Sequence, residues 1–266
     1  DASSNPEPMF TARDSSSKVQ SITERVQVGH DKQGRVMVYF GTGTYYQVGD
    51  NSVPSNPTIE TFYGILDTGA NVSGRANLLQ QTILDEQTFN GTPVRITSDN
   101  SSTGLDSTKQ GWYLDLYYKD SSGTVTNKGE RSVSDAVLNG GRIIFTTLIP
   151  EGSACEYGGD SWLMELDAST GSRLTDESPF DLDGNNKIDD SDLVTYTDTD
   201  GKEHVVAVSG KKSNVGIIKT PGIISAGEIQ YKYYSGSTGK IGATTESAGT
   251  SSGGRLSWQQ LLPTGG

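Results

Sequence analysis

WLMELDASTG, residues 162–171, is the stretch that decides the fold, because its pattern occurs three times in the chain. The related segments are FYGILDTGA at residues 62–70 and WYLDL at residues 112–116. Each begins with an aromatic residue, continues with alternating apolar residues and reaches an acidic one, and two of the three carry Thr-Gly after it. Their spacing is about 50 residues, the size of one four-stranded propeller blade. The repeats therefore favour a β-propeller over other β architectures.

The rest of the chain has the same β character. Short apolar runs recur about every 8–15 residues and are separated by Gly, Asn and Asp turns, and no long stretch has helical periodicity. We therefore expect an all-β fold, a modified β-propeller with quinoprotein-like blades, either as a whole ring or as part of a larger one. Residues 1–20 are polar and are expected to form a lead-in, and residues 21–266 the propeller.

The composition narrows the function classes. The 266 residues carry a net charge of −12, which argues against nucleic-acid binding because that function needs a basic surface. No apolar run has the length of a membrane-spanning helix, so we expect no membrane insertion. The chain starts at Asp1 and is expected to be a mature form or a fragment. Cys155 is the only cysteine, and the two histidines lie far apart, so neither an internal disulfide nor a zinc site is expected.

The segment FDLDGNNKIDDSDLV, residues 180–194, has the ligand spacing of an EF-hand-type calcium loop. Calcium is a hard cation that takes six to eight oxygen ligands, and a tightly curled loop turns alternate residues inward. Counted from the first acidic residue, oxygen ligands fall at loop positions one, three, five, nine and twelve, and position seven supplies its backbone carbonyl. The predicted ligands within loop 181–192 are Asp181, Asp183, Asn185, Lys187 (carbonyl), Asp189 and Asp192.

Two positions depart from the usual loop. Position six is Asn186 in place of Gly, which is tolerable because Asn enters the left-handed backbone region more readily than other non-glycine residues. Position twelve is Asp192 in place of Glu, so its reach is shorter. The residues before the loop do not form a helix. We expect a Kd for calcium of about 10⁻⁵ to 10⁻³ M; the alternative is an acidic surface turn without an ion.

A longer, collinear set of segments resembles one known family. VMVYFGTGTYY, TFYGILD, GERSVSDAVLNGGRIIFTTLIP, CEYGGDSWLMELDASTGSRL and GGRLSWQQLL resemble the C-terminal propeller domain of the PilY family, the tip-associated adhesins and assembly factors of type IV pili. The resemblance covers roughly residues 8–262. It implies a calcium loop without flanking helices that maps onto Asp181, Asp183, Asn185, Lys187 and Asp189; Asp192 follows from the twelve-residue pattern alone.

The resemblance also implies a function. It indicates a non-enzymatic, calcium-binding domain at the pilus tip that acts in pilus biogenesis, in extension against retraction and in adhesion to surfaces or host cells. The expected partners are minor pilins and an unidentified surface receptor, and the expected location is the cell surface after export through the periplasm and outer membrane. Twitching motility would depend on the same pili.

Two other functions are open at this stage. A quinoprotein-type dehydrogenase would also combine a propeller with calcium, but here the loop supplies most ligands itself and no basic cluster is available for the carboxylates of a quinone. A calcium-dependent glycan- or protein-binding module is the other alternative. Its binding surface would be built from tyrosines that a strand exposes on one face, namely Tyr45, Tyr46, Tyr117, Tyr118, Tyr233 and Tyr234.

Overall fold

The computed structural model describes residues 8–249, apart from 101–104, 106–107, 121, 153–157 and 176. The expected all-β class is confirmed, since the helical segments in this part of the chain are two 3₁₀ turns, η1 (Arg75–Asn77) and η3 (Asp190–Asp192). Both Cys155 and the last expected strand, in RLSWQQLL, lie outside the described residues. No helix of the described chain is long and apolar enough to cross a membrane.

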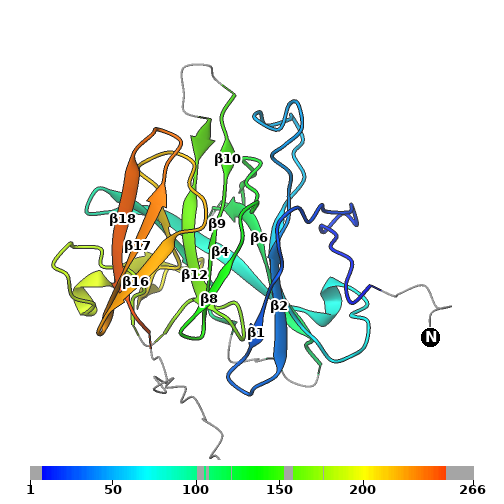
Figure 1. Ribbon diagram of the computed structural model, residues 1–266, viewed down its shortest axis with the longest axis horizontal. Helices are drawn as coiled ribbons and strands as arrows, with labels where there is room; N and C mark the ends of the chain where they lie inside the picture. The colour runs from blue at the N-terminus through cyan, green and yellow to red at the C-terminus, as the bar shows by residue number, and fades with distance from the viewer. Residues whose placement is uncertain are drawn as a thin grey trace, which may run out of the picture.

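A single long sheet forms the body of the molecule (Figure 1). Its first part is a four-stranded antiparallel unit in the order β1 (Gln27–His30), β2 (Val36–Gly41), β3 (Thr61–Leu66) and β6 (Gly111–Lys119). The short β7 (Val125–Thr126) pairs with the far end of β6. A hairpin of β4 (Leu79–Phe89) and β5 (Thr92–Thr97) continues the sheet, with β4 parallel to β6.

The second part of this sheet is another four-stranded antiparallel unit. It begins where β5 pairs with β15 (Gly210–Lys212) and continues through β12 (Trp162–Asp167) and β9 (Arg142–Thr146) to β8 (Val137–Asn139). The sheet curls so far that its two edge strands meet. Gly29 on β1 packs directly against Leu138 on β8. A Cβ atom at Gly29 would lie 2.0 Å from the Leu138 Cδ2 atom.

The three repeats meet inside this curled sheet. The first two do not occupy equivalent strands of successive blades: they are neighbours, with Phe62 of β3 opposite Leu114 of β6. The third repeat lies across the core, where the Trp112 indole donates a hydrogen bond of 3.0 Å to the Ala168 carbonyl. Gly171, with a φ of +70°, packs under the same indole. The regular spacing of the three repeats therefore reflects a shared packing site in the core. It does not mark the start of successive blades.

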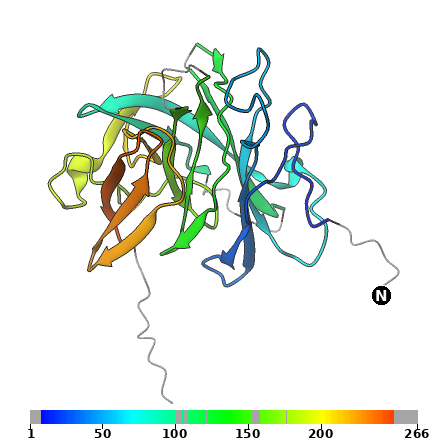
Figure 2. The ribbon, with the colours of Figure 1, turned by 45° about the horizontal axis from the view of Figure 1, so that its top comes forward.

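Three smaller sheets surround this body (Figures 1 and 2). The strands β16 (Gly222–Ala226), β17 (Ile229–Ser235) and β18 (Ile241–Ser247) form an antiparallel layer that covers one side of the second unit, drawn in orange. The second small sheet is a hairpin of β13 (Val194–Thr197) and β14 (Glu203–Val206), which precedes this layer in the sequence. In the third, β10 (Ile149–Pro150) pairs with β11 (Gly159–Asp160).

Three apolar clusters fill the interior. The largest lies inside the curled sheet, where the rings of Phe62 and Phe145 stack with centroids 3.8 Å apart. The second lies between the long sheet and the β16–β18 layer, and it includes Phe180 and Leu182 from the start of the calcium-type loop. The third joins the N-terminal segment to β3, through Phe10 and Tyr63, whose centroids are 5.2 Å apart. Residues 9–20 thus pack on the body of the molecule.

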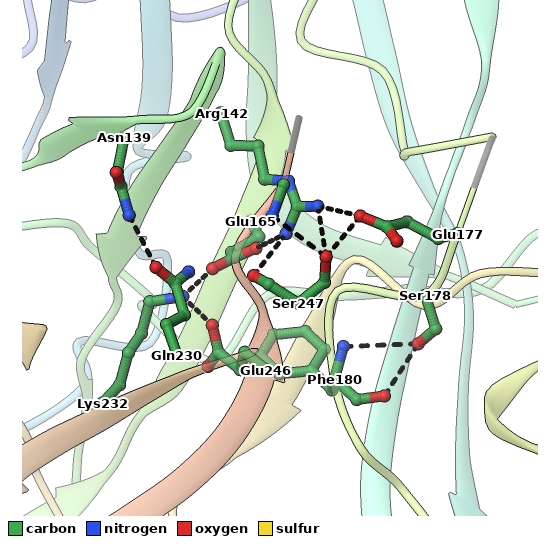
Figure 3. A network of polar contacts seen from close by, with 11 residues as sticks. Asn139, Arg142, Glu165, Glu177, Ser178, Phe180, Gln230, Lys232, Glu246 and Ser247 are labelled. Atoms are coloured by element: carbon green, nitrogen blue, oxygen red, sulfur yellow. Dashed lines mark hydrogen bonds and ion pairs between the residues drawn. The ribbon is translucent and has the colours of Figure 1, made fainter. Parts of the chain in front are cut away.

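A buried charge network ties the β16–β18 layer to the long sheet (Figure 3). Lys232 of β17 has no exposed side-chain surface and contacts the carboxylates of Glu165 on β12 and Glu246 on β18. Arg142 of β9 contacts Glu165 at 3.3 Å and bonds the Ser247 carbonyl at 3.1 Å. Because each cation meets an acidic partner from another strand, the network sets how the two sheets face each other.

Candidate metal centre

The calcium-type loop begins at a rigid anchor. Phe180 forms a β-bridge with Glu246 of β18, and the Asp181 N–H donates to the Thr245 carbonyl at 3.1 Å. Phe180 is fully buried and Leu182 nearly so, both in the second apolar cluster. The apolar residues on either side of Asp181 therefore fix the first expected ligand against the β16–β18 layer.

Three of the expected ligands come together. The carboxylates of Asp181, Asp183 and Asp192 each offer an oxygen within 4.8 Å of the others. Asp181 and Asp192 are buried, whereas Asp183 is exposed to solvent. The loop folds back on itself, so that Asp181 at its start and Asp192 at its end lie close together although ten residues separate them.

Backbone hydrogen bonds to the carboxylates hold this turn. Asp181 accepts the N–H groups of Gly184 at 2.7 Å and Asn186 at 2.9 Å. Asp192 accepts the N–H of Leu182 at 2.7 Å through one oxygen and that of Asp189 at 3.1 Å through the other. Asn186 has a φ of +61°, so the left-handed conformation expected at position six is present.

The other expected ligands lie in the exposed part of the loop. Asn185 donates its amide to Asp183 at 2.9 Å and accepts the Lys187 N–H at 2.7 Å. Asp189 lies outside the group of three carboxylates and is connected to Asp183 through Ser191, whose hydroxyl is 2.6 Å from Asp189 and 2.8 Å from Asp183. Ser191 is a loop residue that sequence reasoning did not single out; it occupies position eleven and supports two neighbouring acidic groups.

The electrostatics differ between the ends of the loop. Burial raises the pKa of Asp192 above its ordinary value, while the hydrogen bonds from Ser191 lower the pKa of Asp183 and of Asp189. Lys211 on β15 is largely buried, which lowers its pKa, and the nearby Asp181 and Asp192 oppose that effect. The loop carries carboxylates at Asp181, Asp183, Asp189, Asp190 and Asp192. The ammonium groups of Lys187 within the loop and Lys211 beside it offset only part of this charge, an arrangement that favours uptake of a cation.

The donor set decides which cation fits. The grouped atoms are all carboxylate oxygens, which suit hard ions such as Ca²⁺ and Mg²⁺ and are a poor set for zinc, which prefers nitrogen and sulfur. Calcium tolerates irregular shells of six to eight oxygens, some of them from water. The exposed position of Asp183 leaves room for water on that side. The residues present thus fit a hard divalent cation such as calcium, which Asp181, Asp183 and Asp192 would hold.

Comparison with known proteins places the chain among pilus proteins, although no protein-family model matches it. It is 34% identical over 221 residues to the type IV pilus biogenesis factor PilY1 of Pseudomonas aeruginosa strain PAO1, a match that covers 77% of this chain and 18% of that protein. It is 35% identical over 173 residues to a PilY1 homolog of Xylella fastidiosa strain Temecula1, covering 64% of this chain and 11% of that protein. The chain therefore spans less than a fifth of the length of these relatives.

The fold is also similar to a solved structure from the same family. The crystal structure of the Pseudomonas aeruginosa PilY1 C-terminal domain superposes with a TM-score of 0.72 and 25% identity, over 91% of this chain and 48% of that one. This match confirms the family and the propeller class expected from the sequence, and it includes nearly all of the described fold.

Proposed function

Because this chain belongs to the PilY1 family through the C-terminal domain, we propose that it is a calcium-binding domain acting in type IV pilus biogenesis. The observation that carries the proposal is the structural match over 91% of the chain, together with the three carboxylates that its loop brings within 4.8 Å. In the proposed role the domain resides at the pilus tip on the cell surface, contacts minor pilins and contributes to adhesion and twitching. It performs no catalysis.

Calcium would act through the loop's position between two elements. Phe180 at its start bridges to β18, and Asp192 at its end is followed, after one residue, by β13. Without a cation, the carboxylates of Asp181, Asp183 and Asp192 repel one another at short range. Calcium would neutralise them and hold the β13–β14 hairpin at a defined angle to the β16–β18 layer. A hairpin that is ordered only when calcium is bound would give the pilus a calcium-dependent contact surface.

A graft tests both halves of this proposal. The chain would replace the corresponding C-terminal segment of Pseudomonas aeruginosa PilY1 in cells lacking their own copy, and surface pili would be quantified from sheared pilin. We expect the wild-type graft to restore surface pili. We expect the Asp181→Asn graft to give fewer pili, or a different dependence of their number on the external calcium concentration. Asp200→Asn is the matched control, since Asp200 lies in the exposed turn between β13 and β14, outside the loop.

The outcomes separate the two claims. If the wild-type graft is expressed and folded but restores no pili, the role in pilus biogenesis is wrong for this chain. If the wild-type and Asp181→Asn grafts give equal numbers of pili at every calcium concentration, the role of calcium is wrong and the biogenesis role stands alone.

A further inference from the structure

Two cavities adjoin on the long sheet, beside the β13–β14 hairpin. One has a volume of about 800 Å³ and lies between β4, the end of β6 and β13; the other has about 630 Å³ and lies between β6, η1 and the N-terminal segment. They share three lining residues, Gln80, Asp115 and Tyr117. Each volume falls within the range of small-molecule sites. Because they share a wall, one extended ligand can occupy both.

Tyrosines line this pair of cavities. Tyr117 is half-buried at the junction, and within the described part of the chain its hydroxyl makes no hydrogen bond. Tyr118 lies in the larger cavity, with its hydroxyl 3.4 Å from Asp85. Tyr196 reaches the same cavity from β13, and its ring stacks on His204 with centroids 5.2 Å apart. Aromatic rings held in this way offer apolar faces beside polar groups.

The polar lining carries both signs of charge. Arg13 and Arg75 line the smaller cavity together with Asp14, and Lys119 lines the larger together with Asp85, Asp120 and Asp198. Arg75 is held inside the wall, because it bonds Asp115 through one nitrogen and its guanidinium lies 4.0 Å from the centroid of the Tyr113 ring. A site of mixed charge does not select a polyanion or a polycation.

We propose that the two cavities form one binding site for a neutral oligosaccharide. Such a ligand presents hydroxyls to Gln80 and Asp115, which line both cavities, and its apolar ring faces stack on the tyrosines. An extended peptide fits less well, because the backbones of β4 and β6 already pair with each other here, with Gln80 opposite Tyr113. The sequence placed Tyr117 and Tyr118 among candidate sugar contacts; Tyr196 and Gln80 carried no such signal.

The test uses the purified chain and four named probes: cellotetraose, chitotetraose, maltotetraose and α-1,6-mannotetraose. Binding is measured by saturation-transfer NMR and calorimetry at millimolar ligand. We expect at least one probe to bind. Tyr117→Ala should weaken that binding by about tenfold or more, the loss that corresponds to removing one stacking face, and Gln80→Ala should weaken it without altering the fold. Tyr233→Ala is the matched control, because Tyr233 is an exposed tyrosine on β17.

Two results with the tetrasaccharides would overturn the proposal. One is the absence of binding for all four tetrasaccharides by a chain that is folded by circular dichroism. The other is binding that Tyr117→Ala and Gln80→Ala leave unchanged, or reduce no more than Tyr233→Ala does. Displacement of a bound probe by an uncharged hexapeptide of equal length, with tighter binding of the peptide, would assign the cavities to a peptide and also contradict the proposal.

Discussion

Replacing Lys232 with methionine should destabilise the protein more than any exposed substitution. Lys232 has no exposed side-chain surface and touches Glu165 and Glu246, so methionine, which has a similar volume, removes the ammonium without opening a large cavity (Figure 3). Glu246 then remains buried without a cation, and Glu165 keeps only Arg142 at 3.3 Å. Breaking a buried ion pair in this way costs about 3–5 kcal/mol. For a domain of this size, that loss corresponds to a decrease in Tm of about 6–20 °C.

The assay is urea unfolding followed by circular dichroism, with calorimetry for Tm. Lys240→Met is the control, since Lys240 is exposed in the turn before β18 and the same substitution there should change the free energy of unfolding by less than about 0.5 kcal/mol. The triple variant Lys232→Met, Glu165→Leu, Glu246→Leu should regain most of the loss, because it leaves no unpaired charge. A Lys232→Met protein as stable as the Lys240→Met control would refute the reasoning.

Three further predictions concern the same fold. Burial raises the pKa of the Glu165 carboxyl from 4.5 to about 7. Between these two pH values the folded protein keeps a proton on Glu165 that the unfolded chain releases. The stability that Glu165 contributes is therefore complete below pH 4.5 and is lost as the pH rises toward 7. Glu165→Gln should therefore flatten the decline in the free energy of unfolding across that interval, and an unchanged slope in urea titrations would count against it. Gly171→Ala should destabilise the protein by about 2–4 kcal/mol, because φ is +70° there and the new Cβ would lie 2.2 Å from the Trp112 ring. Gly201→Ala should cost only about 1 kcal/mol, because its φ of +81° is similar but the space around it is open. Equal losses in thermal unfolding would contradict the packing argument. Asn186→Val should cost about 1–2 kcal/mol because its φ is +61°, whereas Asn186→Gly should not, and equal Tm values for these two variants would show that the turn is relaxed.

Local sequence patterns predicted the elements of this fold well. Turn residues and alternating apolar runs predicted the all-β class. The ligand spacing of residues 181–192 predicted that the carboxylates of Asp181, Asp183 and Asp192 lie close together. Asn186 was expected in the left-handed region and is found there. These features depend on residues close together in the chain, where side-chain chemistry and backbone geometry act directly on each other.

Long-range pairings were out of reach of such patterns. Nothing in the spacing of Phe62 and Trp112 distinguishes strands of successive blades from neighbours in one sheet, which is what they are. In the YKYY run of β17, Lys232 follows the strand alternation into the interior, where only the distant Glu165 and Glu246 make its burial tolerable. Likewise Arg95 is buried between Glu86 and Glu130, which lie on separate segments. A charge network of this kind is visible only after the chain has folded.

Calcium titration by isothermal calorimetry on the metal-stripped chain tests the central claim most directly. We predict one calcium ion per chain with a Kd of about 10⁻⁵ to 10⁻³ M. Binding should be lost in Asp181→Asn and kept in Asp200→Asn, and calcium at about 100 times Kd should add about 2.7 kcal/mol to the free energy of unfolding of the wild type. Absence of binding heat together with an unchanged Tm in millimolar calcium would contradict the account and leave the loop as an acidic surface turn.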